Sequence, residues 1–221
     1  MTSEDAPPEL PVTPPPEERL AEAIVERPGP PGPTRLRVVD WLRRVGRLDR
    51  DAYRTVAGMS TPVLDEPLRQ LTTAANYSRL WFAIGGGLAL FGGKRGRRAA
   101  LTGAAAVAPT SLVVNQPLKY AYRRSRPDRE LLGVPEPRWV VMPKSTSFPS
   151  GHSASAAAFT VAVGRQFPAV NVPLRIVGGL VAFTRVYVGV HYPGDVVVGW
   201  ACGAVIGRAT STLANRIGSD H

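Results

Sequence analysis

Hydrophobic residues gather in five runs along the last two-thirds of the chain, and polar, often basic segments separate them. The runs cover residues 80–93, 99–118, 151–167, 173–189 and 195–213. They are rich in Gly, Ala and Ser, which is typical of helices that pack closely inside a membrane. The first run is short, but the others approach the roughly 20 apolar residues that a membrane span needs. The pattern predicts a helical bundle of about five spans.

Two different patterns precede these runs. Residues 1–34 are polar and Pro-rich, which predicts disorder. Between 35 and 76, apolar positions such as Val38, Trp41 and Val45 alternate with arginines at a helical spacing. This pattern favours helices that lie in the membrane interface. We therefore divide the chain into a tail (1–34), an amphipathic interfacial region (35–78), a transmembrane domain (79–215) and a C-terminal tail (216–221).

The charge of the chain is also uneven. The formal net charge is +10, and the first 33 residues hold seven of the 17 acidic residues but only two of the 27 basic ones. A basic surplus between long apolar runs indicates contact with anionic lipids or a phosphorylated substrate. Nucleic acid is not expected as a partner, because the basic residues do not form one soluble face. A homo-oligomer is compatible with this pattern.

Basic residues also bear on topology. Residues 94–98 (KRGRR) are expected to form a basic loop, and the positive-inside rule assigns that loop to the cytoplasm. This places the loop at 119–149 and the junction at 190–195 together on the outer face. The single cysteine, Cys202, excludes a disulfide within the chain.

Three polar clusters fall at the ends of runs on that outer face. The first contains Lys119 and Arg126, two helical turns apart and followed by Pro127. The second is the sequence Pro-Ser-Gly-His at 149–152, which resembles a helix start. The third contains Thr184-Arg185, then His191 and Asp195.

These residue types suit a phosphoryl group. Three cations, Lys119, Arg126 and Arg185, can surround a tetrahedral dianion. Backbone N–H groups after Ser150, beginning with Gly151, can bind a further oxygen. His191 and His152 can serve as nucleophile and acid, and Asp195 can orient a histidine. The sequence offers no surplus acidic or histidine cluster, so no metal or other cofactor is expected.

The pattern Lys-x6-Arg-Pro, Pro-Ser-Gly-His and Thr-Arg-x5-His-x3-Asp resembles the type 2 phosphatidic acid phosphatase (PAP2) family. The resemblance covers about 80–213 and implies an all-α fold, a polytopic membrane bundle with a core like that of haloperoxidases. Two departures stand out: Thr184 replaces the usual Ser, and the amphipathic region replaces the first of the six spans of larger members. The resemblance implies a multi-pass cell-membrane enzyme that acts on a lipid phosphate.

The resemblance also implies roles. His191 would attack phosphorus, Asp195 would orient it, and His152 would protonate the leaving oxygen and then activate water. Lys119, Arg126, Ser150, Gly151 and Arg185 would bind the phosphoryl oxygens. We expect Arg123, Arg124 and Arg129 to form a solvated rim, while Lys144 and Ser147 either contact substrate or order their loop.

The substrate stays open among a polyprenyl phosphate or pyrophosphate, a phosphoribosylated polyprenyl phosphate and phosphatidate. The alternatives are a vanadate-dependent haloperoxidase, which a membrane location disfavours, and a catalytically silent lipid-binding protein, which the complete motifs disfavour.

Overall fold

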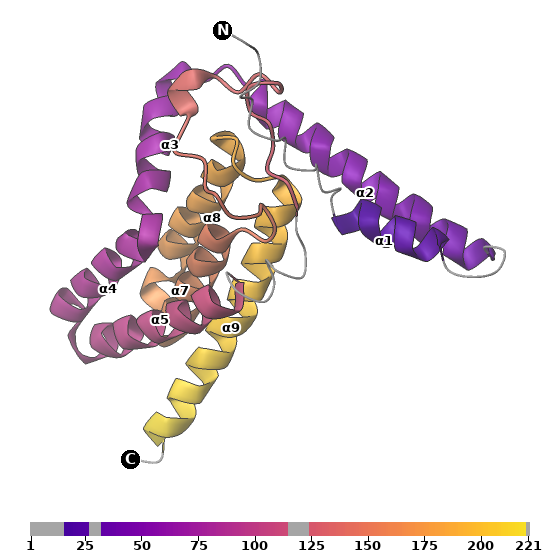
Figure 1. Ribbon diagram of the computed structural model, residues 1–221. Coiled ribbons are helices and arrows are strands. Elements are labelled where there is room, and N and C mark those ends of the chain that lie inside the picture. Colours follow the sequence, from indigo (N-terminus) through magenta and orange to yellow (C-terminus); the bar gives the residue numbers. More distant parts are fainter. Residues whose placement is uncertain (1–15, 27–31, 115–123, 220–221) are drawn as a thin grey trace, which may run out of the picture.

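The computed structural model describes residues 16–26, 32–114 and 124–219, and all regular structure in these ranges is helical (Figure 1). The helices are α1 (Pro16–Val25), α2 (Pro33–Ala57), α3 (Pro62–Ala74), α4 (Arg79–Phe91), α5 (Gly93–Val113), α7 (Gly151–Gln166), α8 (Asn171–Tyr187) and α9 (Pro193–Ser219). Short 3-10 turns lie at η1 (Asn76–Ser78), η3 (Glu136–Arg138) and η4 (Pro168–Val170). The expected all-α class is confirmed for the described ranges.

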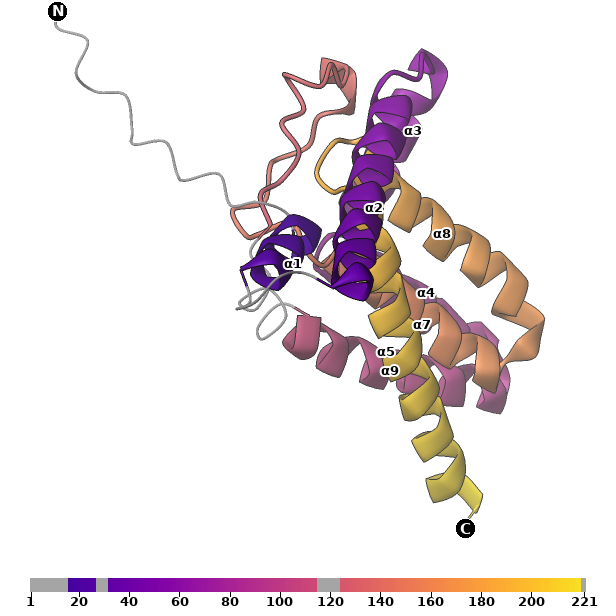
Figure 2. The same cartoon turned by 90° about the vertical axis from the view of Figure 1, so that its right-hand side faces the viewer.

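Helix α7 is the centre of the bundle, with α5, α8 and α9 packed around it (Figure 2). It begins after Ser150, whose side chain accepts a hydrogen bond from the backbone N–H of Ser153 and so caps the helix. Every residue from 153 to 164 is buried. Its small side chains, mainly Ala and Ser, allow neighbouring helices to approach closely from several sides.

A stripe of glycines sets the approach of α9 to α7. Gly199, Gly203 and Gly207 are spaced by four residues and face the backbone of α7 at Ser150, Ala154 and Ala158. A Cβ at any of the three glycines would lie 2.0–2.5 Å from a carbonyl oxygen of α7, well inside contact distance. The close packing brings the first turns of α7 and α9 together, and those turns carry Ser150 and Asp195.

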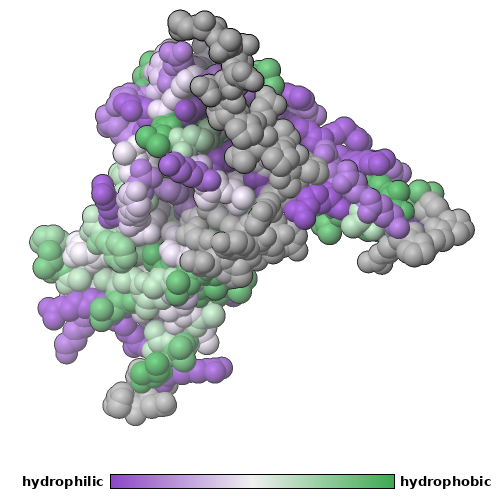
Figure 3. Space-filling model, in the orientation of Figure 1, coloured by the Kyte–Doolittle hydropathy of each residue, from purple (hydrophilic) through white to green (hydrophobic). Residues whose placement is uncertain are grey.

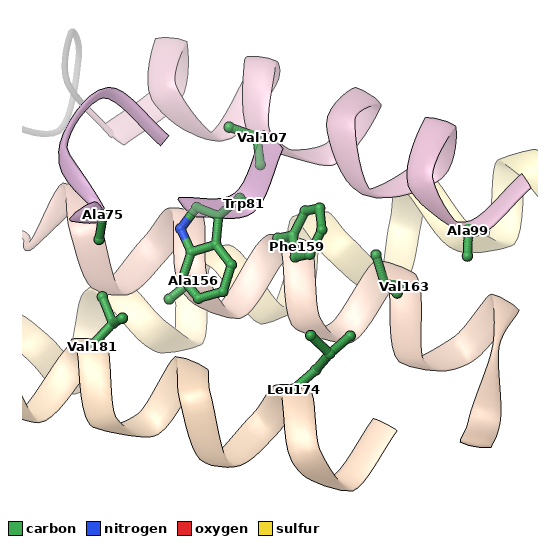
Figure 4. Close-up of a cluster of buried hydrophobic side chains, with 9 residues drawn as sticks. All are labelled: Ala75, Trp81, Ala99, Val107, Ala156, Phe159, Val163, Leu174 and Val181. Atoms are coloured by element: carbon green, nitrogen blue, oxygen red, sulfur yellow. The ribbon is translucent and has the colours of Figure 1, made fainter. Parts of the chain in front are cut away.

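Aromatic side chains fill the space between α4, α5, α7 and α8 (Figure 4). The rings of Trp81 and Phe159 lie 5.4 Å apart, and both side chains are almost wholly buried. A Cβ on Gly103 of α5 would collide with Phe159 and Val163, so the hairpin of α4 and α5 depends on that glycine to reach α7.

Helices α1 and α2 form an arm beside the bundle (Figure 1). An ion pair between Glu18 and Arg50 at 2.9 Å joins the two helices. Residues 16–25 thus form a helix where the sequence predicted disorder, because α2 provides a partner for the buried Ala21. The rest of the predicted tail that we expected to be disordered falls largely outside the described residues.

Exposed apolar surface covers the lower half of the bundle, while the α2 arm is mostly hydrophilic (Figure 3). Within the described ranges, two helical stretches are long and apolar enough to cross a membrane, Pro168–Tyr187 and Pro193–Ile217. Helices α4, α5 and α7 correspond to the other predicted runs. The expected basic loop at 94–98 is instead the start of α5, because Gly92 and Gly93 alone make the turn from α4.

Candidate functional site

Five of the eight predicted site residues line one cavity of about 650 Å³. Arg126, Gly151, His152, Arg185 and His191 all line this cavity. Its other walls come from η1, the start of α4, the end of α5 and the loop before α7. Lys119, which was also predicted to bind phosphate, lies outside the described residues.

His191 is held in the turn between α8 and α9. The backbone N–H groups of Val190 and His191 donate to the carbonyl of Arg185, at 3.2 and 3.1 Å. Gly189 has φ +74°, a left-handed conformation that suits glycine, and the turn packs tightly against Tyr53. The turn therefore fixes both the backbone and the direction of His191, whose side chain is 3 % exposed.

The partners of His191 define its tautomer. Nη1 of Arg126 lies 3.3 Å from Nε2, and a guanidinium can only donate, so Nε2 accepts. The ring proton is then on Nδ1, which lies 3.5 Å from Oδ2 of Asp195 and 3.5 Å from Oγ of Ser147. The lone pair of Nε2 therefore points toward the arginine side of the cavity.

Asp195 lies behind His191 and is fully buried. Its Oδ2 accepts hydrogen bonds from the hydroxyl of Ser147 and from the backbone N–H of Tyr192, the latter at 2.9 Å. Its carbonyl accepts from the backbone N–H of Ser150 at 3.0 Å. The first turns of α7 and α9 are thus joined directly at the site.

Burial controls the protonation of two groups in this site. Desolvation lowers the pKa of His191 to about 4, although the hydrogen bond to Asp195 acts in the opposite direction. Desolvation also lowers the pKa of Arg126 to about 10. At neutral pH, His191 is therefore neutral and Arg126 remains charged, the combination that a histidine nucleophile and an anionic substrate require.

Two arginines face the cavity from different elements. Arg126 donates to the carbonyls of Ser145, Thr146 and Val190, at 2.8, 3.2 and 2.7 Å, which fixes its guanidinium beside His191. Arg185 is 2 % exposed and donates to the hydroxyl of Thr72. Its Nε has no hydrogen-bond partner among the described residues. A buried, unpaired donor in a cavity wall suits an anionic ligand.

His152 occupies the first turn of α7 on another wall of the cavity, and its Nε2 lies 2.9 Å from Oδ1 of Asn76. Asn76 begins η1, and the next two residues, Tyr77 and Ser78, have φ of 53° and 60°. Such left-handed conformations cost about 1 kcal/mol or more for residues other than glycine. The contact to His152 is thus made by a strained turn.

Several contacts of the site differ from those that the sequence predicted or were not predicted. Arg124 was expected to lie in a solvated rim, but it is 4 % exposed and forms an ion pair with Asp195 at 2.8 Å. Ser147 contacts Asp195 instead of reaching for substrate, and Asn76 and Thr72 were not considered. Of these residues, only Arg124 could have been linked to the site from the sequence, because it lies two residues before Arg126. Among the described residues, no group of three or more acidic, His or Cys side chains could hold a metal ion.

Known proteins resemble this chain in sequence. Residues 99–218 match the family model described as the PAP2 superfamily. The decaprenylphosphoryl-5-phosphoribose phosphatase of Mycobacterium tuberculosis is 34% identical over 76% of this chain and 93% of that protein. The undecaprenyl-diphosphatase BcrC of Bacillus subtilis is 29% identical over 72% of this chain and 81% of its own.

A solved structure has the same fold. The transmembrane PAP2 type phosphatidylglycerolphosphate phosphatase from Bacillus subtilis aligns with a TM-score of 0.62. The alignment covers 90% of this chain and 92% of that one at 20% identity. At that identity the likeness establishes the fold and leaves the substrate open.

Proposed function

This chain belongs to the PAP2 superfamily, and from that premise we propose that it hydrolyses the phosphate of a polyprenyl-type membrane lipid through a phosphohistidine at His191. The family and its named phosphatase relatives make the chain a lipid phosphatase. The mechanism and the choice of lipid are our proposal. One observation carries it: His191 turns Nε2 to Arg126 and Nδ1 to Asp195 at the wall of a 650 Å³ cavity.

In the first step, Nε2 of His191 attacks phosphorus as the bond from phosphorus to the lipid oxygen breaks. His152 donates a proton to that oxygen, and the lipid leaves as an alcohol or, from a pyrophosphate, as a monophosphate. Attack leaves positive charge on the imidazole of His191, which the carboxylate of Asp195 stabilises. The proton of Nδ1 stays on His191 throughout.

In the second step, water attacks the phosphohistidine while His152 accepts its proton. The bond from phosphorus to Nε2 breaks, inorganic phosphate leaves, and Nε2 recovers its lone pair. Arg126, Arg185, Lys119 and the N–H group of Gly151 stabilise the equatorial oxygens in both steps. Ser150, which the sequence predicted to bind phosphate, donates its N–H to the carbonyl of Asp195 and caps α7 with its hydroxyl instead. Substrate oxygens would take over the contact that Arg126 now makes with Nε2.

The lipid is best sought among polyprenyl phosphates that carry a second polar group. The cavity combines hydroxyl and amide groups with the apolar side chains of Phe82 and Val107, and Val141 at its edge is 92% exposed. A relative that this chain matches over 93% of its length is named for a decaprenylphosphoryl phosphoribose. We therefore rank a phosphoribosylated polyprenyl phosphate first, ahead of polyprenyl pyrophosphate and phosphatidate.

The membrane arrangement is part of the same proposal. Helices α4, α5, α7, α8 and α9 would be the five spans of the transmembrane domain at 79–215, with the cavity on the outer face. Four exposed apolar positions of α2 recur every three or four residues, Val38, Trp41, Val45 and Leu48, and Leu36 is also exposed. Such a stripe, flanked by arginines, suits a helix that lies in the lipid interface.

The test is release of phosphate from a panel of these lipids by the full chain in detergent micelles. We expect turnover that EDTA leaves unchanged, a phosphohistidine that can be trapped with radiolabelled substrate, and loss of both in His191→Ala. Turnover without a phosphoenzyme would contradict the mechanism. Failure on the whole panel, by protein that is folded, would contradict the function.

A further inference from the structure

A buried arginine connects the proposed active site to the N-terminal arm. Nη1 of Arg124 lies 2.8 Å from Oδ1 of Asp195, and Nη2 lies 2.7 Å from Oδ2 of Asp49 in α2. The guanidinium stacks over the ring of Tyr192 at 4.0 Å. The side chains of Arg124 and Asp49 are 4% and 9% exposed, so water screens these ion pairs little.

Asp49 also fixes the turn that carries the catalytic residues. Its Oδ1 accepts a hydrogen bond from the backbone N–H of Gly194 at 2.6 Å, one residue before Asp195. One side chain of α2 therefore contacts both the arginine that binds Asp195 and the backbone beside Asp195. The position of α2 and the position of the catalytic carboxylate are linked.

The charges explain why such an arrangement is useful. An arginine alone beside Asp195 would cancel the negative charge that a cationic His191 needs. Asp49 also forms an ion pair with this guanidinium, and the carboxylate of Glu17 in α1 lies 3.6 Å from its Nη2. Arg124 thus gives Asp195 a strong, directional hydrogen-bond donor. The net charge of the cluster stays negative, because three carboxylates surround one guanidinium.

The arginine is not placed for stability alone. Its Nε is buried and has no hydrogen-bond partner among the described residues, which costs folding free energy. Burial by itself would lower the pKa of Arg124, but the charges of Asp195 and Asp49 raise it above its ordinary value. Arg124 therefore stays charged in a buried place, where the carboxylates around the site and the ring of Tyr192 offset the cost of its desolvation.

We infer that Arg124 and Asp49 are positioning residues of the phosphoryl-transfer site. Through these two side chains, helix α2 of the N-terminal arm holds the carboxylate of Asp195 beside His191. This inference rests on the proposed function, because it assigns Arg124 and Asp49 to the same reaction. It makes the N-terminal arm a component of the catalytic apparatus in addition to its contact with lipid.

The chain contains a matched control. Arg138 is also buried, pairs with Asp65 at 2.7 Å and stacks over Tyr187 at 4.2 Å. Its Nε and both Nη atoms bond to groups of α2, α3 and the segment between them. The partners of Arg138 within the described part of the chain do not include His191 or Asp195, so Arg138→Gln and Asp65→Asn should lower thermal stability only.

The experiment compares Arg124→Gln, Asp49→Asn, their double variant and the two control variants as full-length proteins in micelles. We expect kcat to fall about 10- to 100-fold in Arg124→Gln and about 3- to 10-fold in Asp49→Asn, with KM little changed. Asp49→Asn keeps an oxygen that can accept from the N–H of Gly194, so it removes chiefly the charge that pairs with Arg124. The double variant should therefore lose no more than about twofold beyond Arg124→Gln. The control variants should keep the kcat of the folded fraction.

The second readout is the pKa of His191, from NMR of histidine-labelled protein. Loss of the cation in Arg124→Gln should raise this pKa, and loss of the carboxylate in Asp49→Asn should lower it. Unchanged kcat and unchanged His191 pKa in both variants would overturn the inference, as would equal effects in Arg138→Gln. An inactive wild-type protein would instead contradict the proposed function, and the His191 pKa would still decide the positioning role.

Discussion

His191 and His152 face the same cavity but are held by different kinds of structure. His191 lies in a tight turn between two helices, is almost fully buried, and has Asp195, Ser147 and Arg126 around it. His152 is half-buried in the first turn of α7, and Asn76 from the turn η1 contacts it.

The difference matches the two roles that we propose. A nucleophile must hold one atom at a fixed distance from phosphorus, which a buried and fully packed turn does well. An acid must reach the leaving oxygen of the bound lipid, and a half-buried side chain in the cavity wall is accessible to that oxygen. Four predictions test how far the comparison holds.

The largest effect is expected for His191→Ala. Removal of the nucleophile should lower kcat by about 10⁴-fold or more and abolish the phosphoenzyme, because the second histidine of the cavity, His152, lies on another wall with its Nε2 beside Asn76. Phosphate release and trapping of labelled enzyme measure this. His221→Ala, at the chain terminus, serves as the histidine control and should keep full activity. Activity above about one hundredth of wild type in His191→Ala would remove the distinction between the two histidines.

A smaller loss is expected for His152→Ala, about 10²- to 10⁴-fold on a lipid phosphate, the range for removal of a general acid. The decrease in the rate of phosphoenzyme formation should be smaller on an aryl phosphate, because its leaving group needs no proton. Rapid-quench measurement of phosphoenzyme formation on both substrates separates this step from hydrolysis. Equal losses on both substrates would indicate that His152 is not the acid.

A third prediction concerns the contact that holds His152. Asn76→Ala removes one hydrogen bond and should lower kcat about 3- to 10-fold, with the effect again larger on the lipid than on the aryl phosphate. Asn215→Ala, which loses a hydrogen bond to Gln166 far along α9, is the matched control and should keep wild-type kcat. An equal decrease in kcat on both substrates in Asn76→Ala would show that Asn76 does not act through His152.

The smallest effect is a difference in titration. With its pKa lowered to about 4 by burial, His191 should stay about nine-tenths neutral at pH 5, so its own protonation should cost little activity between pH 7 and 5. Because the unfolded chain takes up this proton near pH 6.5, His191 should reduce folding stability as pH falls from 6.5 to 4, and not above that window. NMR titration of labelled histidine measures the pKa. A value near 6.5 would place His191 in a solvated setting like that of any surface histidine.

Much of the bundle followed from sequence pattern because its causes are local. The apolar runs at 151–167, 173–189 and 195–213 became α7, α8 and α9 with ends shifted by a few residues. The helix start at Ser150 depends on a side chain that bonds three residues ahead. The error at 94–98 is local too, since Gly92 and Gly93 make a sharper turn than a basic loop of five residues requires.

Contacts between distant segments could not be found in this way. Residues 76 and 152 meet because α3, η1 and α7 pack together, and residues 49 and 124 meet because α2 lies against the start of α9. In the sequence, Arg124 lies among other arginines, a pattern typical of a surface segment. No neighbouring residue indicates that Asp49 and Asp195 are its partners.

By itself, the sequence determined the helical class and the order of the helices, and it singled out the side chains that we propose to react, because hydrophobic period, helix caps and motif spacing act within a few residues. Only the tertiary structure decided which nitrogen of His191 faces Arg126, which residue contacts His152, and which cation pairs with Asp195. Those outcomes depend on burial and on packing between segments up to about 150 residues apart, such as Asp49 and Gly194.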